Sequence, residues 1–197
     1  MNSLYSFIVK PLKERYDNIK TISGKKLIIN TGIEDYKFIS KKAVVVSTPV
    51  AFKTKINIED EVYIHHNIFR RWYDQKGKER NSSTYFKDDL YFVSPEQIYM
   101  YNLKSHLNYC FIKPIKNQSF LQNRKEQPNV GIVKYTNNTL EALGITPGTL
   151  ITFTPNSEFE FIIDGERLYC MKSNDIALTH EYKGNETENN PSWAKSS

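Results

Sequence analysis

The histidines are the first residues that could do chemistry, since imidazole nitrogens bind metal ions and move protons. His65 and His66 are adjacent in a segment expected to form a strand. Successive side chains of a strand point to opposite faces, so the pair is poorly arranged to share one ion. His106 and His180 are distant in sequence and complete no ligand spacing typical of zinc sites. We therefore expect no metal site and no cofactor.

The carboxylates and thiols give no catalytic pattern either. The pairs and triplets at Asp88–Asp89 and Glu59–Glu61 fall where turns are expected to lead into strands, which is typical of solvated turn residues. Cys110 and Cys170 each stand among apolar residues of an expected strand, as buried thiols do. The sequence has no Gly-x-Ser-x-Gly motif, no phosphate-binding loop and no dinucleotide fingerprint. We expect a protein that is not an enzyme.

A group of cations and aromatic rings in the first half of the chain is a candidate interaction site. It consists of Arg70, Arg71, Trp72 and Tyr73, with further cations close behind them. Such a mixture can stack on the bases and contact the phosphates of single-stranded nucleic acid. Residues 74–77, however, read as a turn. A hairpin with an exposed basic tip, used in a contact within or between proteins, explains the segment more simply.

The overall charge does not by itself indicate nucleic acid. The chain of 197 residues has a formal net charge of +5 and a pI near 9.0. Its lysines are scattered among asparagines, glutamates and tyrosines, which is typical of a mildly basic solvated surface. We therefore expect no nucleic-acid partner.

Composition favours a protein that folds in water. The hydrophobic share of 39% is enough for two modest packed cores in a chain of this length. The mean hydropathy is −0.56 and no apolar run approaches the about 20 residues of a spanning helix, which argues against an integral membrane protein. Residues 1–6 lack the features of a secretory signal. We expect an intracellular protein without a membrane partner.

An internal repeat defines the elements that position these groups. Four segments of the first half recur in the same order in the second half, as short apolar stretches separated by Gly, Pro, Asn and Asp. Short strands with such turns are typical of a small all-β barrel. The four pairs are 7–13 with 111–116, 43–48 with 130–136, 56–64 with 143–153, and 88–99 with 165–177.

Two local signals lie in the second half. The dipeptide Asp164-Gly165 separates two apolar stretches and predicts a two-residue hairpin turn, because it tolerates positive φ. Residues 139–143 predict a single helical turn. Asn138 or Thr139 is its expected N-cap, since a short polar side chain can accept a hydrogen bond from the first turn.

The repeat divides the chain into three parts. We expect a first β-barrel over residues 1–103, a second over residues 104–182, and a polar tail over residues 183–197. The tail is too polar to bury much, apart from Trp193, which could dock on a neighbouring surface.

The order of these segments resembles that of the GroES-like co-chaperonins, the ten-kilodalton partners of the ring chaperonin GroEL. The first copy has Val9-Lys10-Pro11-Leu12 at its start, a β-branched strand and an acidic turn inside, and Leu90–Ile98 at its end. The second copy repeats the order through 147–151 and 169–176. The resemblance implies an all-β fold of two tandem GroES-like antiparallel β-barrels.

The working part of that family is a mobile loop with an aliphatic tripeptide, and residues 23–32 stand at the matching place. The residues that resemble the chaperonin-binding ones are Gly24, Leu27, Ile28 and Ile29. The resemblance implies a ring of identical chains that caps a GroEL-type chaperonin, in which many weak contacts add up. The alternative is that Lys26–Asn30 forms a plain short strand.

Two departures from the family favour a second hypothesis. Residues 117–128 of the second copy have no aliphatic triplet, and the first copy carries the insert 68–81 where the family has a tighter connection. A structural protein, such as a bacteriophage virion component, could keep the barrel without the chaperonin contact. We expect a co-chaperonin in the cytoplasm of a bacterial host, with the virion as the alternative location and other virion proteins as the alternative partners.

Overall fold

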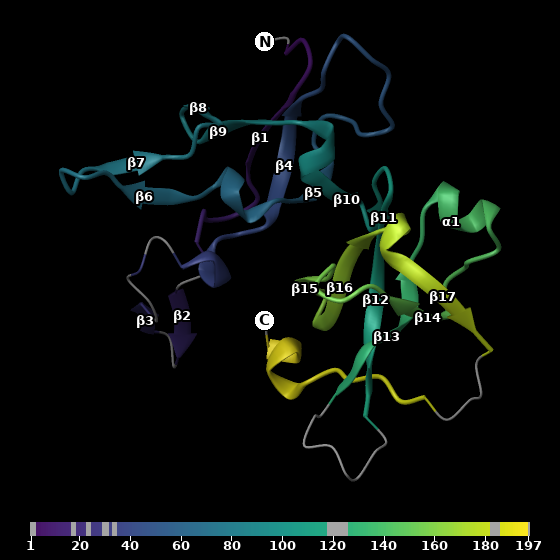
Figure 1. Cartoon of the computed structure of the whole chain (residues 1–197). Helices are drawn as coiled ribbons and strands as arrows, with labels where there is room; N and C mark the ends of the chain where they lie inside the picture. Colours follow the sequence, from purple (N-terminus) through teal and green to yellow (C-terminus); the bar gives the residue numbers. More distant parts are fainter. Residues whose placement is uncertain are drawn as a thin grey trace. The chain divides into compact units, whose positions relative to one another are not determined.

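The computed structural model describes residues 3–16, 19–22, 25–28, 32, 35–117, 126–181 and 186–196. The chain forms two compact units, Met1–Asn102 and Leu103–Ser197, called here the first and the second unit. Strands dominate both units and pair antiparallel (Figure 1), as the all-β expectation requires. Neither main sheet closes on itself within the described residues.

The first unit has one main sheet and two separate hairpins. Six strands of this sheet lie in the first unit, in the order β10-β5-β4-β1-β9-β8, and the seventh, at the β10 edge, is β11 (Lys104–Ser105). The six strands are β1 (Phe7–Pro11), β4 (Lys42–Ser47), β5 (Glu61–Ile64), β8 (Tyr85–Lys87), β9 (Leu90–Val93) and β10 (Ile98–Tyr101). The hairpins are β2 (Ile19–Ile22) with β3 (Lys25–Ile28), and β6 (Arg71–Tyr73) with β7 (Glu79–Asn81). Short 3-10 turns are η1 (Tyr36–Phe38), η2 (His66–Ile68) and η3 (Pro95–Gln97).

The second unit has a sheet of six strands in the order β17-β14-β13-β12-β16-β15. The short strand β11 (Lys104–Ser105) precedes them along the chain. They are β12 (Tyr109–Lys116), β13 (Glu126–Tyr135), β14 (Leu150–Phe153), β15 (Phe159–Ile163), β16 (Glu166–Lys172) and β17 (Ile176–His180). The helical elements are α1 (Asn138–Ala142), η4 (Ser173–Asp175) and η5 (Ser192–Ser196).

Apart from β11, the strands of the two sheets have the same order, as an internal repeat predicts. Numbered along the chain, the six strands of each unit run sixth, third, second, first, fifth, fourth. The pairing register is also the same, since Val9 lies opposite Val45 and Tyr91, and Ile112 lies opposite Val133 and Tyr169. Even the irregularities coincide, because the register shifts just before Val9 in β1 and just before Ile112 in β12.

The turn into the third strand is repeated atom by atom. The N–H of Glu59 donates to the carbonyl of Val45 at 2.8 Å, and the N–H of Gly148 donates to that of Val133 at the same distance. Both residues have positive φ, 73° for Glu59 and 93° for Gly148. Glycine adopts this conformation without the steric penalty that a Cβ brings. The second unit therefore has the residue that the turn favours, and the first does not.

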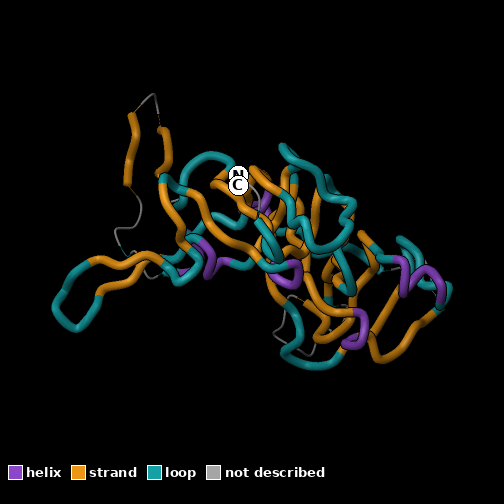
Figure 2. Tube along the Cα trace, turned by 90° about the horizontal axis from the view of Figure 1, so that it is seen from above, coloured by secondary structure: helices purple, strands orange, loops and turns teal. Residues whose placement is uncertain are grey.

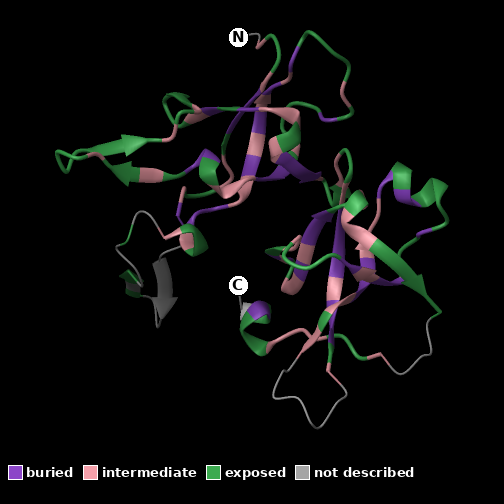
Figure 3. Cartoon of the chain, viewed as in Figure 1, coloured by how far each residue is buried: buried purple, intermediate pink, exposed green. Residues whose placement is uncertain are grey.

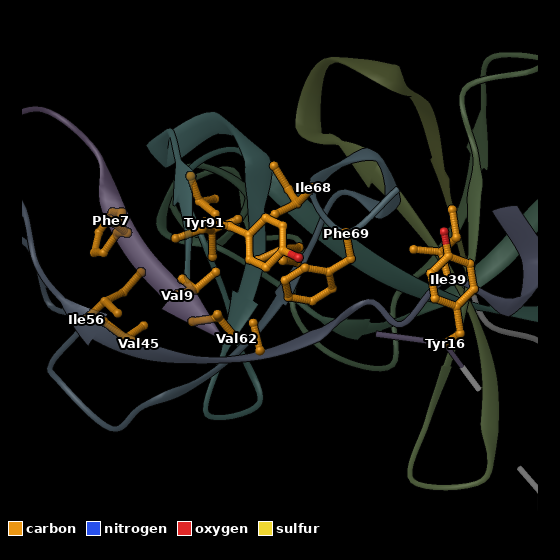
Figure 4. Close-up of a cluster of buried hydrophobic side chains, with 14 residues drawn as sticks. Phe7, Val9, Tyr16, Ile39, Val45, Ile56, Val62, Ile68, Phe69 and Tyr91 are labelled. Carbon is orange, nitrogen blue, oxygen red and sulfur yellow. The ribbon is translucent and has the colours of Figure 1, made fainter. Parts of the chain in front are cut away.

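Each unit has its own core, built from alternate residues of its strands. In the first unit Phe7, Val9, Val45, Val62 and Tyr91 are buried together (Figures 3 and 4). The core of the second unit contains Cys110, Ile112, Leu140, Val133, Ile145, Ile151, Phe153 and Met171. The second unit has a further buried cluster of Ile115, Ile132 and Leu150, so it differs from the first unit in its packing although it shares the pairing.

Two local expectations meet the structure differently. Asp164 and Gly165, with φ of 50° and 74°, form the two-residue turn between β15 and β16, as predicted. The predicted helical turn is present as α1, but its N-cap is Asn137, one residue earlier than expected. The Asn137 side chain accepts a hydrogen bond from the N–H of Leu140 at 3.1 Å, and its amide also donates to the carbonyl of Tyr109. This tertiary contact selects the cap.

The C-terminal segment packs more closely than a polar tail should. The N–H of Lys116 donates to the carbonyl of Thr187, and the N–H of Asn189 donates to that of Pro114, both at 2.7 Å. Ala194, in η5, is fully buried. Residues 186–196 thus lie against the second unit, where an isolated antiparallel bridge joins Glu188 to Ile115 of β12, whereas Trp193 is half exposed. Backbone hydrogen bonds, which polar composition does not reveal, hold this segment in place.

Candidate functional site

The aliphatic residues that resemble a chaperonin contact lie on the β2–β3 hairpin. Leu27 and Ile28 belong to β3, which among the described residues pairs with β2 alone and is not part of the main sheet. Their side chains are 51% and 66% exposed, so neither belongs to the core of the first unit. The structure therefore has Lys25–Ile28 as a strand, the alternative to a loop, yet leaves the two side chains accessible. Gly24 and Ile29 lie outside the described residues.

The aromatic and basic group lies on the β6–β7 hairpin, as the hairpin interpretation predicts. This hairpin extends from the main sheet and has its own two-stranded pairing (Figures 1 and 2). Its turn is closed by Asp74, whose carboxylate accepts hydrogen bonds from the N–H groups of Lys76 and Lys78 at 2.9 Å. The hydrogen bond from the Lys78 N–H, followed by the Arg80 side chain and the Lys76 N–H, lowers the pKa of Asp74.

The base of the β6–β7 hairpin is fixed by two residues that follow β1. Tyr16 is buried, and its hydroxyl accepts a hydrogen bond from the N–H of Arg71 at 2.9 Å while the Arg71 guanidinium lies 4.7 Å from its ring centre. Arg15 donates to the carbonyl of Phe69 and to the side chain of Asn81. These contacts join both strands of the hairpin to the body of the unit. The sequence alone gives no sign of them, because they span more than 50 residues.

The four residues singled out on this hairpin differ in their surroundings. Arg70 is exposed, and Trp72 and Tyr73 are 42% and 53% exposed. Arg71 is half-buried and forms an ion pair with Glu79 at 2.9 Å. Trp72 and Tyr73 are neighbours in β6 and therefore face opposite sides of the ribbon. Trp72 shares its side with Arg80, its cross-strand partner.

His65 and His66 do not point to opposite faces as expected. The strand β5 ends at Ile64 and the chain turns into η2, so the two rings stack with centres 4.4 Å apart. The Nδ1 atom of His65 accepts a hydrogen bond from the N–H of Asn67. Burial, then the positive charges of His65, Lys41 and Arg70, lowers the pKa of His66 to about 4. The described residues contain no cluster of His, Cys, Asp and Glu that could hold a metal ion.

The second unit has a polar cluster that sequence reasoning missed. Arg167 donates to Glu126 and to Glu160 at 2.6 Å, and the Tyr169 hydroxyl donates to Glu126 at the same distance. Burial and then the hydrogen bond to Glu126 raise the pKa of Tyr169. The first unit has a weaker counterpart, in which the hydroxyl of Tyr91 donates to Asp89 beside Arg15. Because these groups satisfy one another, the cluster is suited to hold strands together.

The cysteines are buried, as predicted, and chemically protected. Cys110 and Cys170 are both fully buried. Burial, with a smaller contribution from Asp175, raises the pKa of Cys110 to about 12. A thiol with so high a pKa is almost entirely protonated near neutral pH and is a poor nucleophile.

Comparisons with protein families and with curated proteins find no match. No protein-family model matches the chain, and no curated protein is significantly similar to it. No helix in the parts of the chain that the structure describes is long and apolar enough to cross a membrane. Function must therefore be argued from the two exposed hairpins of the first unit.

Proposed function

We propose that the protein is a co-chaperonin of the GroES-like kind, two tandem barrel units that cap a GroEL-type ring chaperonin through the aliphatic segment of β3. The exposure of Leu27 and Ile28 on a hairpin outside the main sheet carries the proposal. Exposed adjacent aliphatic side chains tend to be covered by a partner, and an apolar groove is the natural receptor for a short extended segment.

The repeated sheet supports the same proposal at the level of assembly. A single hairpin contact with two or three aliphatic side chains is weak, which suits a cap that must be released. Several chains held in one ring would multiply these contacts into firm but reversible binding. The second unit, whose segment 117–128 lacks an aliphatic triplet, would then serve the assembly and not the contact.

The test is nucleotide-dependent co-elution of the whole chain with a GroEL-type chaperonin. We expect Ile28→Asp to abolish co-elution, because the partner's apolar groove would have to bury a carboxylate. Ile58→Asp is the matched control, since Ile58 is 59% exposed in a turn of the same unit. Co-elution that survives Ile28→Asp, or that is never seen with the unchanged chain, would reject the proposal.

A structural protein of a virus particle is the second candidate. The β6–β7 hairpin favours it, because an anchored ribbon with exposed Trp72 and Tyr73 is suited to a permanent contact in an assembly. This candidate predicts a stoichiometric band of the chain in purified particles and no association with a chaperonin.

A further inference from the structure

We propose that the β6–β7 hairpin is a binding site for single-stranded nucleic acid, with Trp72 as the stacking surface for a base and the nearby cations as phosphate contacts. This activity is separate from the proposed chaperonin contact, which uses the β2–β3 hairpin. Four properties of the described residues support it: the placement of charge, its neutralisation, the exposed ring and the anchoring of the hairpin.

The positive charge of the chain is concentrated in this part of the molecule. The first unit has 17 Lys and Arg against 12 Asp and Glu, a net charge of +5, whereas the second has 10 of each. Residues 70–81 alone have five cations against two carboxylates, a net charge of +3. The cations that look scattered in the sequence thus form a local positive field, which attracts a polyanion.

Both carboxylates of the hairpin are neutralised within it. Asp74 accepts hydrogen bonds from two backbone N–H groups and pairs with Arg80 at 2.9 Å. Glu79 pairs with Arg71 at 2.9 Å. Three cations, Arg70, Lys76 and Lys78, have no carboxylate within ion-pair distance among the described residues, and all three are exposed. They are available to phosphate groups.

Trp72 lies beside a cation across the ribbon. Its cross-strand partner is Arg80, so these two side chains share one side, and Lys78 stands at the turn just before β7, where its carbonyl accepts a hydrogen bond from the N–H of Asp74. The Trp72 ring makes no contact with another aromatic ring in the described parts of the chain and is 42% exposed. An exposed indole beside cations is the arrangement with which proteins stack bases without reading their sequence.

The hairpin is held ready for binding. Hydrogen bonds from Arg71 to Tyr16 and from Arg15 to Asn81 fix its two strands at the base. A contact surface that is already ordered loses less conformational entropy when a ligand binds. Repulsion between the hairpin and a ligand's phosphates is also small, because the two carboxylates of the hairpin, Asp74 and Glu79, are already paired with arginines.

The first experiment titrates a fluorescein-labelled 20-mer of thymidylate with the full chain and follows anisotropy at several salt concentrations. We expect a dissociation constant of about 1–100 µM at physiological salt, as for non-specific binding, and tighter binding at lower salt. With three phosphate contacts, the slope of log K against log salt should be about −2, since each contact on single strands contributes about −0.7. No binding at low salt would overturn the proposal.

The variants separate stacking from charge. We expect Trp72→Ala to weaken binding about tenfold with an unchanged salt slope, because a stacked base is lost but no phosphate contact is. The double variant Lys76→Glu, Lys78→Glu should weaken binding and reduce the slope to about −0.7. Its matched control, Lys53→Glu with Lys55→Glu, changes the net charge of the same unit equally and should bind within about twofold of the unchanged chain.

A direct readout avoids any dependence on variant folding. The chain has two tryptophans, so in a Trp193→Phe variant the fluorescence reports Trp72 alone. Quenching by the oligonucleotide supports the proposal, and unchanged fluorescence during binding overturns it. Equal weakening by the control double variant would show that binding follows the net charge and not the hairpin, which overturns the proposal. Displacement of the oligonucleotide by poly-L-glutamate without any effect of Trp72→Ala would assign the hairpin to acidic protein surfaces and likewise overturn it.

Discussion

At the scale of single residues, the repeat supplies its own controls, because positions on the six shared strands and their turns have equivalents in both units. Glu59 and Gly148 occupy the same turn with the same hydrogen bond and both have positive φ. Nothing in the sequence marks Glu59 as such a position, since glutamate is not typical of left-handed backbone. The comparison of the two equivalent turns, one with glycine and one with glutamate, identifies Glu59 as a strained residue.

Glu59 and Gly148 predict changes of opposite sign in the free energy of unfolding of their units. Glu59→Gly should raise the free energy of unfolding of the first unit by about 0.5–1 kcal/mol, because it removes the clash between Cβ and carbonyl that left-handed backbone imposes. Gly148→Ala should lower that of the second unit by about 1 kcal/mol. A Cβ at Gly148 would meet no atom within 4 Å, so backbone strain alone would act. Urea denaturation measures both changes, and a loss of stability in Glu59→Gly would show that the Glu59 side chain makes contacts that matter more than its backbone.

At the scale of elements, the strands of the two main sheets were predictable from the sequence, but the tertiary contacts around them were not. Apolar and β-branched stretches predict β1, β4, β12 and β13, since alternation and strand propensity are local properties. The same is true of the turn at Asp164-Gly165. The N-cap of α1, the stacked rings of His65 and His66, and the docking of residues 186–196 depend on contacts between distant segments, which local patterns do not contain.

The C-terminal segment bonded to β12 yields a prediction about the second unit. Asn189→Pro should free the carbonyl of Pro114, because proline has no N–H to donate. We expect a loss of about 1 kcal/mol in the stability of that unit and faster hydrogen exchange at the amide of Lys116, which donates to Thr187. The amide of Leu12, bonded to Lys42 in the first unit, is the internal control. Unchanged exchange at Lys116 would mean that the segment is not held by these backbone bonds.

At the scale of the whole molecule, the two units share one strand arrangement but differ in the hairpins and segments that are added to it. The first unit carries the two exposed hairpins and all of the net charge, whereas the second carries the bonded C-terminal segment and the Arg167 cluster. The sequence revealed the duplication through four repeated segments, because the cores require the same apolar spacing. It did not reveal the candidate sites equally well. The sequence shows the cations and aromatic residues of the β6–β7 hairpin as a group. Which of these cations are paired with carboxylates, and which are available to a ligand, depends on the geometry between the two strands.

Two compact units with separate cores should respond separately to damage in one core. Val45 and Val133 are equivalent residues, each 1% exposed in its own unit. Val45→Ala should lower the stability of the first unit by about 2 kcal/mol through lost burial and the cavity left behind, and Val133→Ala should do the same to the second. Hydrogen exchange followed by mass spectrometry, with peptides assigned to each unit, measures both at once. We expect faster exchange confined to the unit that carries the substitution. Equal acceleration in both units would mean that the chain unfolds as one cooperative body, and that the duplicated sheets depend on each other for stability.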